Sequence, residues 1–432
     1  MINQHYDLSV VVLAQNWANN LTILLTEIQS TLDSLAIIYE IILVGDQNNE
    51  PIDQLIQQNQ VRILYPITRG YGAAIKAGIH QSVGDYVIVM DADQTAPAAL
   101  LRDLWKARDT AHVIIASRYI GAGRAIMPGV RRLLSKLLNL LFSRGLDLRV
   151  RDMSSGFRLY KSQVIKNLIT ECNDYDILQE ILVKVLMEGY RILEIPYRYE
   201  SLDTGLIRAT HFGLAYLKTF ARLWKLRNSI ASADYDARAY DALMPPQRYW
   251  QRQRFKIITQ LLNGQRKCLD VGCGSSRIIG ALPPGSVALD ILIRKLRYAH
   301  RFGLPTVQGS IFNLPVPTGS FPCILCSQVI EHVPRTNVFH ELDRALQPGG
   351  FLILGTPDYA KWQWLVIEWL YKILLPQAYA DEHISHYTYQ ELFDEFVTRR
   401  GYQLEVTRYI LQGELILGLR KPASEEANLQ IN

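Results

Sequence analysis

The sequence has few cysteines and no long apolar run. Five cysteines in 432 residues are too few for a scaffold built on disulfides. The most apolar stretch, 362–375, is interrupted by Glu368 and Lys372, so it is too short and too charged to span a bilayer. No apolar leader follows Met1. We therefore expect a cytoplasmic chain whose cysteines are thiols.

Charge of either sign is not in excess. Forty-six Lys and Arg residues are balanced by 41 Asp and Glu, which leaves a net charge of +5 and does not predict a nucleic-acid partner. Basic residues do mix with leucines and aromatics at helical spacing in 129–144 and 212–227. Such stretches are typical of helices at a lipid surface and also of helices packed on a sheet. The first alternative predicts a peripheral contact with the inner face of a membrane.

The composition, with 49% apolar residues, is sufficient for two folded cores. Short β-branched runs alternate with helix-like stretches, which predicts parallel sheets covered by helices. The alternation stops at 229–248, where small and polar residues and a Pro-Pro pair indicate a linker, and then restarts. We expect the α/β class with two Rossmann-like domains, 1–228 and 249–425, and a tail at 426–432. The expected strands are residues 8–14, 39–44, 61–65, 86–90, 112–116, 267–272, 286–291, 322–327 and 350–356.

Two aspartates, Asp91 and Asp93, directly follow the expected strand at 86–90. Ligands of parallel sheets lie beyond the carboxyl ends of the strands, so both side chains are placed to meet one. Carboxylates this close repel each other. A divalent cation would relieve the repulsion, and so would a capped, solvated loop. The neighbouring motifs favour the cation.

Those motifs follow one another in a recognisable order. They are the glycine-rich segment 69–86, "ASRYIGAG" (116–123), "RDMSSGFRLY" (151–160) and "GYRILEIPYRY" (189–199). With the aspartate pair, they resemble the GT-A-fold glycosyltransferases, most closely the polyprenyl-phosphate sugar synthases such as dolichol-phosphate mannose synthase, over residues 7–228. The resemblance implies a GT-A fold and an inverting, metal-dependent transfer of a sugar from a nucleotide-sugar donor to a polyprenyl phosphate or lipid-linked glycan.

The resemblance also implies roles for individual residues. Asp91 would contact the donor nucleotide or the metal, and Asp93 would bind the Mg²⁺ or Mn²⁺ that bridges the donor diphosphate. The other implied donor contacts are Asn16, Asp46, Gly70 and Gly72. The residues implied to hold an acceptor phosphate are Arg118, Arg131 and Ser135. If the acceptor is a hydroxyl, Asp152 is the candidate base, and its alternative role is to orient the Ser-Ser-Gly turn after it.

Three positions depart from the family pattern. Trp17 follows Asn16 where a glutamate is usual, and Asp46 lacks its usual second aspartate. Gly205 to Arg208 replace the usual Gly-x-Ser-Lys. These departures are compatible with a different sugar donor and also with a loss of glycosyltransferase activity. In the second case, only the other domain would be active, and the N-terminal domain would be a membrane or glycan adaptor.

A second glycine-rich turn, "CLDVGCGSS", lies at 268–276. Its glycines let the backbone come close to a ligand. Asp290, about twenty residues later at the end of the next strand, can accept hydrogen bonds from both hydroxyls of a ribose. With 309–333 and 346–357 in order, the segment resembles the class I S-adenosylmethionine methyltransferases over 249–425. The resemblance implies S-adenosylmethionine as cofactor, held by Asp270, Gly272, Gly274, Asp290, Ser310 and Ile311.

Three histidines are candidates for the methyl acceptor site. Methyl transfer depends mainly on positioning the acceptor, and a base sometimes helps. His332 could be that base or a structural residue beside the cofactor. His383 and His386 could be bases, or metal ligands by their spacing, although no third ligand is evident near them in the sequence. Thr388 and Glu391 form a capping box, which places this pair in the loop before a helix.

Four cysteines also allow two interpretations. Cys323 and Cys326 form a CxxC pair on a strand expected to lie beside Cys268 and Cys273. Zinc or redox chemistry is one interpretation, but the apolar strand context favours buried thiols. We therefore expect a bifunctional enzyme in which a glycosyltransferase is joined to a methyltransferase that modifies a related glycan or lipid-linked product.

Overall fold

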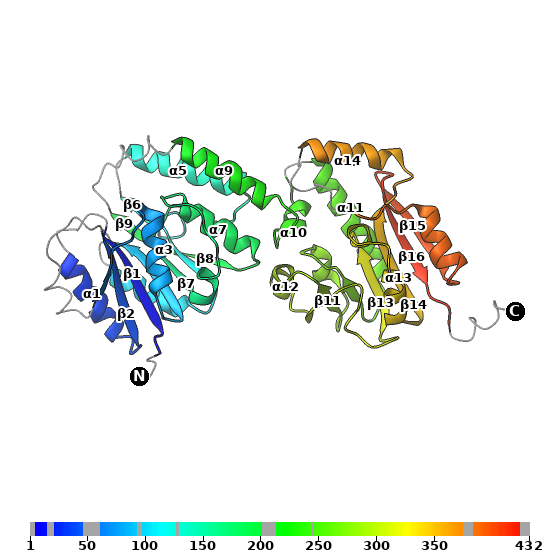
Figure 1. The fold of residues 1–432 in the computed structure, drawn as a ribbon, viewed down its shortest axis with the longest axis horizontal. Helices are drawn as coiled ribbons and strands as arrows, with labels where there is room; N and C mark the ends of the chain where they lie inside the picture. Colours follow the sequence, from blue (N-terminus) through cyan, green and yellow to red (C-terminus); the bar gives the residue numbers. More distant parts are fainter. Residues whose placement is uncertain are drawn as a thin grey trace. The chain divides into compact units, whose positions relative to one another are not determined.

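The computed structural model contains two compact units. One consists of Met1–Leu186 and Tyr190–Arg227, and the other of Met187–Gly189 and Asn228–Asn432. Each unit contains one seven-stranded sheet (Figure 1). The structure describes residues 5–14, 21–45, 61–92, 97–126, 129–200, 213–242, 245–374 and 383–423.

The sheet of the first unit is mixed. Its strands are, in spatial order, β3 (Val61–Leu64), β2 (Tyr39–Gly45), β1 (Leu8–Ala14), β4 (Tyr86–Asp91), β7 (Arg158–Lys161), β5 (Val113–Ser117) and β8 (Ile192–Pro196). Strand β7 runs antiparallel to both neighbours, whereas the other pairs are parallel. The sequence predicts only parallel strands here. Strand β7 begins beside Ile115, near the carboxyl end of β5, and runs back antiparallel between β4 and β5.

Helices cover both faces of this sheet. The helices are α1 (Leu21–Asp33), α3 (Tyr71–Gln81), α4 (Pro97–Ala107), α5 (Gly129–Gly145), α6 (Ser162–Ile165), α7 (Ile177–Met187) and α9 (Gly213–Arg227). Apolar side chains of α1 and α4 pack on one face, and Gly78 of α3 lies against Val11 on the other. Every residue of β1 is buried, as expected of a central strand covered on both sides. Strands β6 (Arg124–Ile126) and β9 (Arg198–Glu200) form a separate parallel pair.

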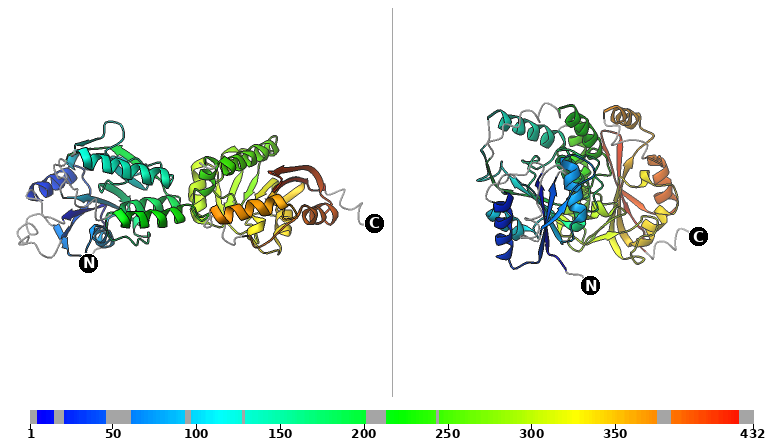
Figure 2. Two further views of the ribbon diagram at one scale, coloured as in Figure 1. Left: turned by 90° about the horizontal axis from the view of Figure 1, so that it is seen from above. Right: turned by 60° about the vertical axis from the view of Figure 1, so that its left-hand side comes forward.

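Helices α5 and α9 pack against each other, and part of the surface of α5 stays exposed. Figures 1 and 2 show them side by side, and the ring of Phe142 lies edge-on to Phe220 with centroids 5.3 Å apart. The buried face of α5 therefore packs within the protein. Its other face exposes Leu133, Leu137, Leu140 and Leu141.

The second unit has five parallel strands followed by an antiparallel pair. In spatial order they are β12 (Thr306–Gln308), β11 (Val287–Asp290), β10 (Leu269–Val271), β13 (Phe321–Ser327), β14 (Leu346–Pro357), β16 (Glu414–Arg420) and β15 (Gln403–Ile410). Helices α11 (Pro245–Leu262), α12 (Ile293–Ala299) and α14 (Trp362–Leu374) pack on one face. Helices α13 (Val338–Ala345) and α15 (Tyr389–Phe393) pack on the other. The predicted α/β class with two such domains is confirmed.

The segment 229–248, which the sequence indicates to be a linker, is part of the second unit. It contains α10 (Tyr235–Tyr240) and the start of α11. The Asp236 carboxylate accepts hydrogen bonds from the backbone N–H and hydroxyl of Ser275 and from Lys295 Nζ, each at 3.0 Å. These bonds fix the segment on the glycine-rich turn despite its loop-like composition.

The cysteines and the apolar helices agree with the sequence-based expectations. All five cysteines are buried free thiols, and the CxxC pair lies on β13, which pairs with β10. Burial raises the pKa of Cys268, Cys273 and Cys326, so these groups stay protonated. Among the described residues, no helix is long and apolar enough to cross a membrane.

Candidate active sites

Asp91 lies half-buried at the end of β4, beside Leu13 of β1. The Tyr71 hydroxyl is hydrogen-bonded to it, and burial together with the Asp91 charge raises the pKa of Tyr71 well above its usual value. Tyr71 is therefore a stable donor to this carboxylate. A Cβ at Gly156 would lie 2.2 Å from the Tyr71 hydroxyl and 3.0 Å from Asp91 Oδ2, so the turn at 152–157 must pass this carboxylate without a side chain.

Several residues predicted to contact the donor, the metal or the acceptor lie wholly or in part outside the described residues. These are Asn16, Asp46, Asp93 and the side chain of Arg131. The roles that the family resemblance implies for them remain predictions.

Gly70 and Gly72 lie at the start of α3, where the loop around Asn173 packs against them. Gly70 has φ +122°, and its Cβ would lie 2.4 Å from the Asn173 carbonyl oxygen. A Cβ at Gly72 would lie 2.7 Å from the Asn173 carbonyl carbon. The backbone N–H of Ala73 donates to the same carbonyl at 3.0 Å. Both glycines are thus required for close packing, and their contact with a donor remains a prediction.

Arg118 and Asp152 form a bidentate ion pair. Arg118 Nε donates to Asp152 Oδ2 and Nη2 donates to Oδ1, both at 2.7 Å, and the Arg118 backbone N–H also donates to Oδ2 at 2.9 Å. Burial alone would raise the pKa of Asp152, but the Arg118 charge and these hydrogen bonds outweigh it and lower that pKa. A carboxylate held in this way is a weak proton acceptor. Its geometry suits positioning Arg118, not the role of a base.

Ser135 belongs to the same polar cluster. Its hydroxyl lies 2.9 Å from that of Tyr119 and 3.3 Å from that of Ser154, to which Arg118 Nη2 donates at 2.7 Å. The structure therefore brings together three of the predicted acceptor residues, Arg118, Ser135 and Asp152. Arg131 lies one helical turn before Ser135 on α5.

Arg158 is a supporting residue that the sequence motifs do not reveal. It is fully buried, and its guanidinium donates to the backbone carbonyls of Ser155, Leu178 and Met153 at 2.7, 2.8 and 2.8 Å. It therefore fixes the turn that carries Asp152 and Ser154. Arg158 is the first residue of β7, a short strand that the sequence does not predict, so no local pattern signalled this role.

A cavity of about 870 Å³ opens at the carboxyl ends of β10, β11 and β13 in the second unit. This volume is ample for a nucleoside-sized ligand and part of a second molecule. The cavity is lined by eight residues that the sequence singles out, namely Asp270, Gly272, Gly274, Asp290, Ser310, Ile311, His332 and His383. The structure thus gathers residues from distant parts of the domain's sequence at one site.

Asp290 holds the glycine-rich turn in place. Its Oδ2 accepts from the Gly274 N–H at 2.9 Å, and its Oδ1 accepts from the Leu292 N–H at 2.8 Å. Each carboxylate oxygen has further acceptor capacity for a ligand hydroxyl. Burial, reinforced by the Asp290 charge, raises the pKa of the neighbouring Asp270 to about 8. Asp270 therefore carries a proton at neutral pH.

The two glycines of the turn satisfy both a backbone and a packing requirement. Gly272 has φ +70°, and its Cβ would lie 2.4 Å from Val329 Cγ2. Gly274 has φ +57°, and its Cβ would lie 2.7 Å from Asp236 Oδ2. Residues with a side chain rarely adopt such angles, so glycine is required twice over.

A buried ion pair behind the cavity has no counterpart among the sequence-based predictions. Glu414 accepts from Arg254 Nε at 2.7 Å, from Arg254 Nη2 at 3.1 Å, and from the Trp250 indole. Gln328 Nε2 also donates to it at 3.2 Å. Burial raises the pKa of Glu414, and the Arg254 charge only partly offsets this effect. Arg254 and Trp250 line the cavity, but no local sequence pattern links them to Glu414.

The sequence spacing suggests His383 and His386 as a pair, but the structure places His383 next to His332. His383 lies beside His332, with ring centroids 4.8 Å apart, and both line the cavity. His386 instead stacks on Tyr359 with centroids 4.1 Å apart. Burial, and then the neighbouring His332, lowers the pKa of His383 to about 3, so its imidazole is neutral at neutral pH. The capping box of Thr388 and Glu391 is confirmed, and it begins α15 after the loop that carries His383.

Family models match one region in each unit. Residues 9–169 match the family model for glycosyl transferase family 2, and residues 269–354 match the family model for a methyltransferase domain. The chain therefore joins a family 2 glycosyltransferase region to a methyltransferase domain, which confirms both resemblances seen in the sequence.

Individual relatives are more distant. The dolichol-phosphate mannosyltransferase of Pyrococcus furiosus is 28% identical over 235 residues, which cover 51% of this chain and 65% of that protein. The undecaprenyl-phosphate 4-deoxy-4-formamido-L-arabinose transferase of Edwardsiella ictaluri is 28% identical over 204 residues, which cover 46% and 61%. The chain thus spans less than two thirds of either relative. Among solved structures, glucosyl-3-phosphoglycerate synthase from Mycobacterium tuberculosis has a TM-score of 0.40 and 16% identity, covering 50% of this chain and 80% of that one.

Proposed function

We propose that this protein is a bifunctional transferase. The first unit transfers a sugar from a nucleotide-sugar to a polyprenyl phosphate or lipid-linked glycan. The second methylates a related acceptor with S-adenosylmethionine. The observation that carries the methyltransferase part of this proposal is one cavity lined by all six predicted cofactor residues and His332. The sugar-transfer part is supported by the match of residues 9–169 to glycosyl transferase family 2 and by Asp91 at the end of β4.

The residues of the cavity fit S-adenosylmethionine. Asp290 can accept from the ribose hydroxyls, since both its oxygens are already oriented by backbone N–H groups. The glycine-rich turn would let the amino-acid part of the cofactor approach, and Ser310 and Ile311, which also line the cavity, would contact the adenine. Asp270, which is buried and protonated, would ionise when a cationic group lies beside it. When bound, the cofactor supplies an electrophilic methyl group, and the protein contributes the alignment of the acceptor and the exclusion of water.

The surroundings of Asp91 in the first unit are compatible with a divalent cation, which the proposal assigns to Asp91 and Asp93. A half-buried carboxylate at the end of a strand, with Tyr71 as a donor on one side, is suited to share a cation with a second carboxylate two residues on. Bound there, Mg²⁺ or Mn²⁺ would supply positive charge to the leaving diphosphate. The metal dependence of the proposed reaction rests on this pair, whereas its inverting course is implied only by the family resemblance.

The polar cluster of the first unit favours an acceptor that is already an anion. Asp152 is bound to Arg118 and has a lowered pKa, so it is not suited to deprotonate a hydroxyl. A phosphate acceptor needs no base. Because Asp152 neutralises Arg118, the additional positive charge would come from Arg131, one turn before Ser135. This arrangement supports a polyprenyl phosphate over a sugar hydroxyl.

Exposed apolar residues on two helices support a peripheral contact with the cytoplasmic face of a membrane. Four leucines of α5 are exposed, and on α14 the side chains of Trp362 and Trp369 are 68% and 60% exposed. Apolar residues beside basic ones are typical of a helix that rests on lipid. Such a contact would bring a lipid-linked acceptor close to the sites proposed for sugar and methyl transfer.

The test is mass spectrometry of lipid-linked and polysaccharide sugars in cells with and without this protein. Loss of both a sugar and a methyl group supports the bifunctional assignment. Loss of the methyl group alone supports the alternative, in which the first unit is an adaptor that binds lipid or glycan. In vitro, the adaptor would bind liposomes without any sugar transfer in the presence of Mn²⁺.

A further inference from the structure

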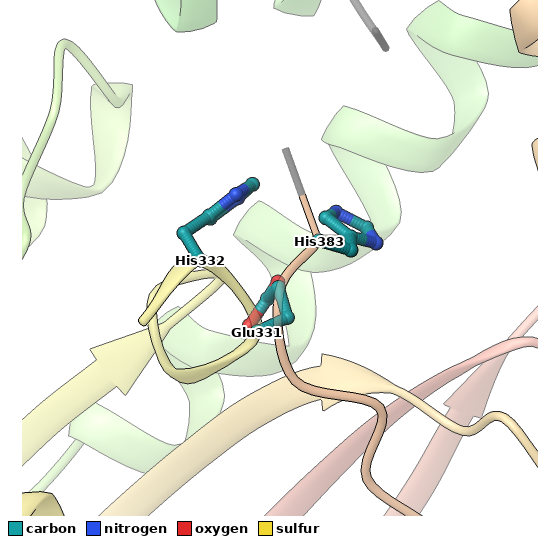
Figure 3. A group of neighbouring side chains, drawn as sticks. All are labelled: Glu331, His332 and His383. Atoms are coloured by element: carbon teal, nitrogen blue, oxygen red, sulfur yellow. The ribbon is translucent and has the colours of Figure 1, made fainter. Parts of the chain in front are cut away.

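A cluster of three potential metal ligands lies on the wall of the methyltransferase cavity. Glu331 and His332 belong to the short turn Ile330–His332 after β13, and His383 comes from the loop before α15. One nitrogen of each imidazole and a carboxylate oxygen of Glu331 all lie within 4.8 Å of one another. Figure 3 shows the three side chains converging on a common space.

The backbone holds these two segments together independently of the side chains. The N–H groups of Ile384 and Ser385 donate to the carbonyl oxygen of Glu331 at 2.8 and 3.0 Å. The Tyr359 hydroxyl also lies 2.5 Å from His383 Nδ1, so a neighbouring group orients this ring. Oriented imidazoles are a regular feature of metal sites, because the second ring nitrogen is held by an outer partner.

The Glu331 carboxylate provides a second observation. The residue is fully buried, and Thr356 Oγ1 donates to Oε2 at 3.1 Å. Among the residues that the structure describes, Oε1 has no hydrogen-bond partner. A buried carboxylate oxygen without a partner is costly, and a cation placed between it and the two imidazoles would offset that cost.

We propose that Glu331, His332 and His383 bind a divalent transition-metal ion that holds and activates a hydroxyl of the methyl acceptor. Two imidazoles and one carboxylate leave coordination positions open, as in catalytic zinc sites. The open side faces the cavity, because His332 and His383 line it. This inference rests on the proposed methyltransferase function and adds the acceptor class, an alcohol such as a sugar hydroxyl.

The chemistry balances without a further reagent. The metal makes the bound hydroxyl more acidic, and its proton passes to solvent. The oxygen forms a bond to the methyl carbon while the carbon–sulfur bond breaks, and the electron pair of that bond stays on sulfur. The products are a methyl ether and the neutral thioether S-adenosylhomocysteine.

The test measures metal binding directly in the full-length chain. The Asp93→Asn substitution first removes the metal site proposed for the first unit. Chelator-treated protein is then titrated with Co²⁺, whose visible absorption reports nitrogen ligands, and bound Zn²⁺ is measured by elemental analysis after dialysis. We expect one equivalent of metal, with affinity at least about tenfold lower in Glu331→Gln and His383→Ala. His386→Ala is the matched control, since His386 lies in the same loop outside the cluster, and it should bind metal as the parent does.

Three outcomes separate the hypotheses. Absence of metal binding in the parent, or equal binding in all variants, would overturn the metal site. Metal binding without S-adenosylmethionine binding would preserve the site and reject the proposed function. Calorimetric binding of S-adenosylmethionine by Glu331→Gln and His383→Ala, at the affinity of the parent, would show that these variants are folded and have lost only the metal.

Discussion

Replacing Asp270 with asparagine should stabilise the second unit at neutral pH and destabilise it in acid. Asp270 has a pKa of about 8 in the folded protein against 3.8 as its ordinary value, because it is buried beside Asp290. At pH 7 the unfolded chain releases a proton that the folded chain keeps. At about 1.4 kcal/mol per pH unit, the wild type loses about 4 kcal/mol of stability between pH 3.8 and 7.

The sign follows from the direction of this shift. Because the pKa of Asp270 is higher in the folded state, this residue contributes to the free energy of unfolding. The contribution is fully present below pH 3.8 and is lost as the pH rises toward 8. The Asp270→Asn variant would avoid this loss but bury an amide at a cost of about 1–3 kcal/mol. The variant should therefore be less stable than wild type at about pH 4 and more stable by about 2 kcal/mol at about pH 7.

Scanning calorimetry between about pH 4 and 8 would measure this crossing. The transition that shifts when S-adenosylmethionine is added identifies the second unit, because a ligand stabilises the unit that binds it. Asp394→Asn, at a half-exposed site in the same unit, controls for the change in net charge. A stability difference between the Asp270 variant and wild type that is the same at both ends of this pH range would refute the reasoning.

Three further predictions concern the two sites. Asp290→Ala should weaken S-adenosylmethionine binding at least about tenfold by titration calorimetry, since two acceptors for the ribose are lost, and an unchanged affinity would remove the ribose assignment. Gly274→Ala should destabilise the second unit by about 2–3 kcal/mol, because its Cβ meets Asp236. Gly285→Ala, with a similar φ of +76° and nothing within 4 Å, should cost only about 1 kcal/mol, and equal losses for both would contradict the packing argument. Asp93→Ala should abolish Mn²⁺-dependent sugar transfer, and the metal hypothesis fails if transfer persists.

The contacts of Asp152 bear on whether this residue acts as a base in the first unit. The sequence leaves this residue either as a base or as part of a turn. Its bidentate pair with Arg118, and the hydrogen bonds that its backbone N–H and that of Arg151 donate to Glu194 at 2.9 Å, favour the second role. An ion pair of this kind fixes a guanidinium in one orientation, which suits the recognition of a phosphate.

Much of the fold can be predicted because its signals are local. Strands β1, β2, β4, β5 and β13, and the second half of β14, are mostly apolar in sequence, since they are covered on both faces. Strand β7 has no such apolar run. Its antiparallel direction depends on its pairing with β4 and β5, which lie far away in the sequence. The segment 229–248 has the composition of a linker, and its composition does not reveal that Asp236 accepts hydrogen bonds from Ser275 and Lys295.

The α/β class, the two families and the glycine-rich turn with Asp290 follow from the amino-acid order, because periodicity and backbone requirements belong to short segments. Which charges meet depends instead on the tertiary structure. Asp152 pairs with Arg118 34 residues away, Glu414 accepts from Trp250 across 164 residues, and His383 lies against His332 instead of pairing with His386. Such contacts depend on how sheets and loops pack, and a buried charge is stable only where that packing brings it a partner.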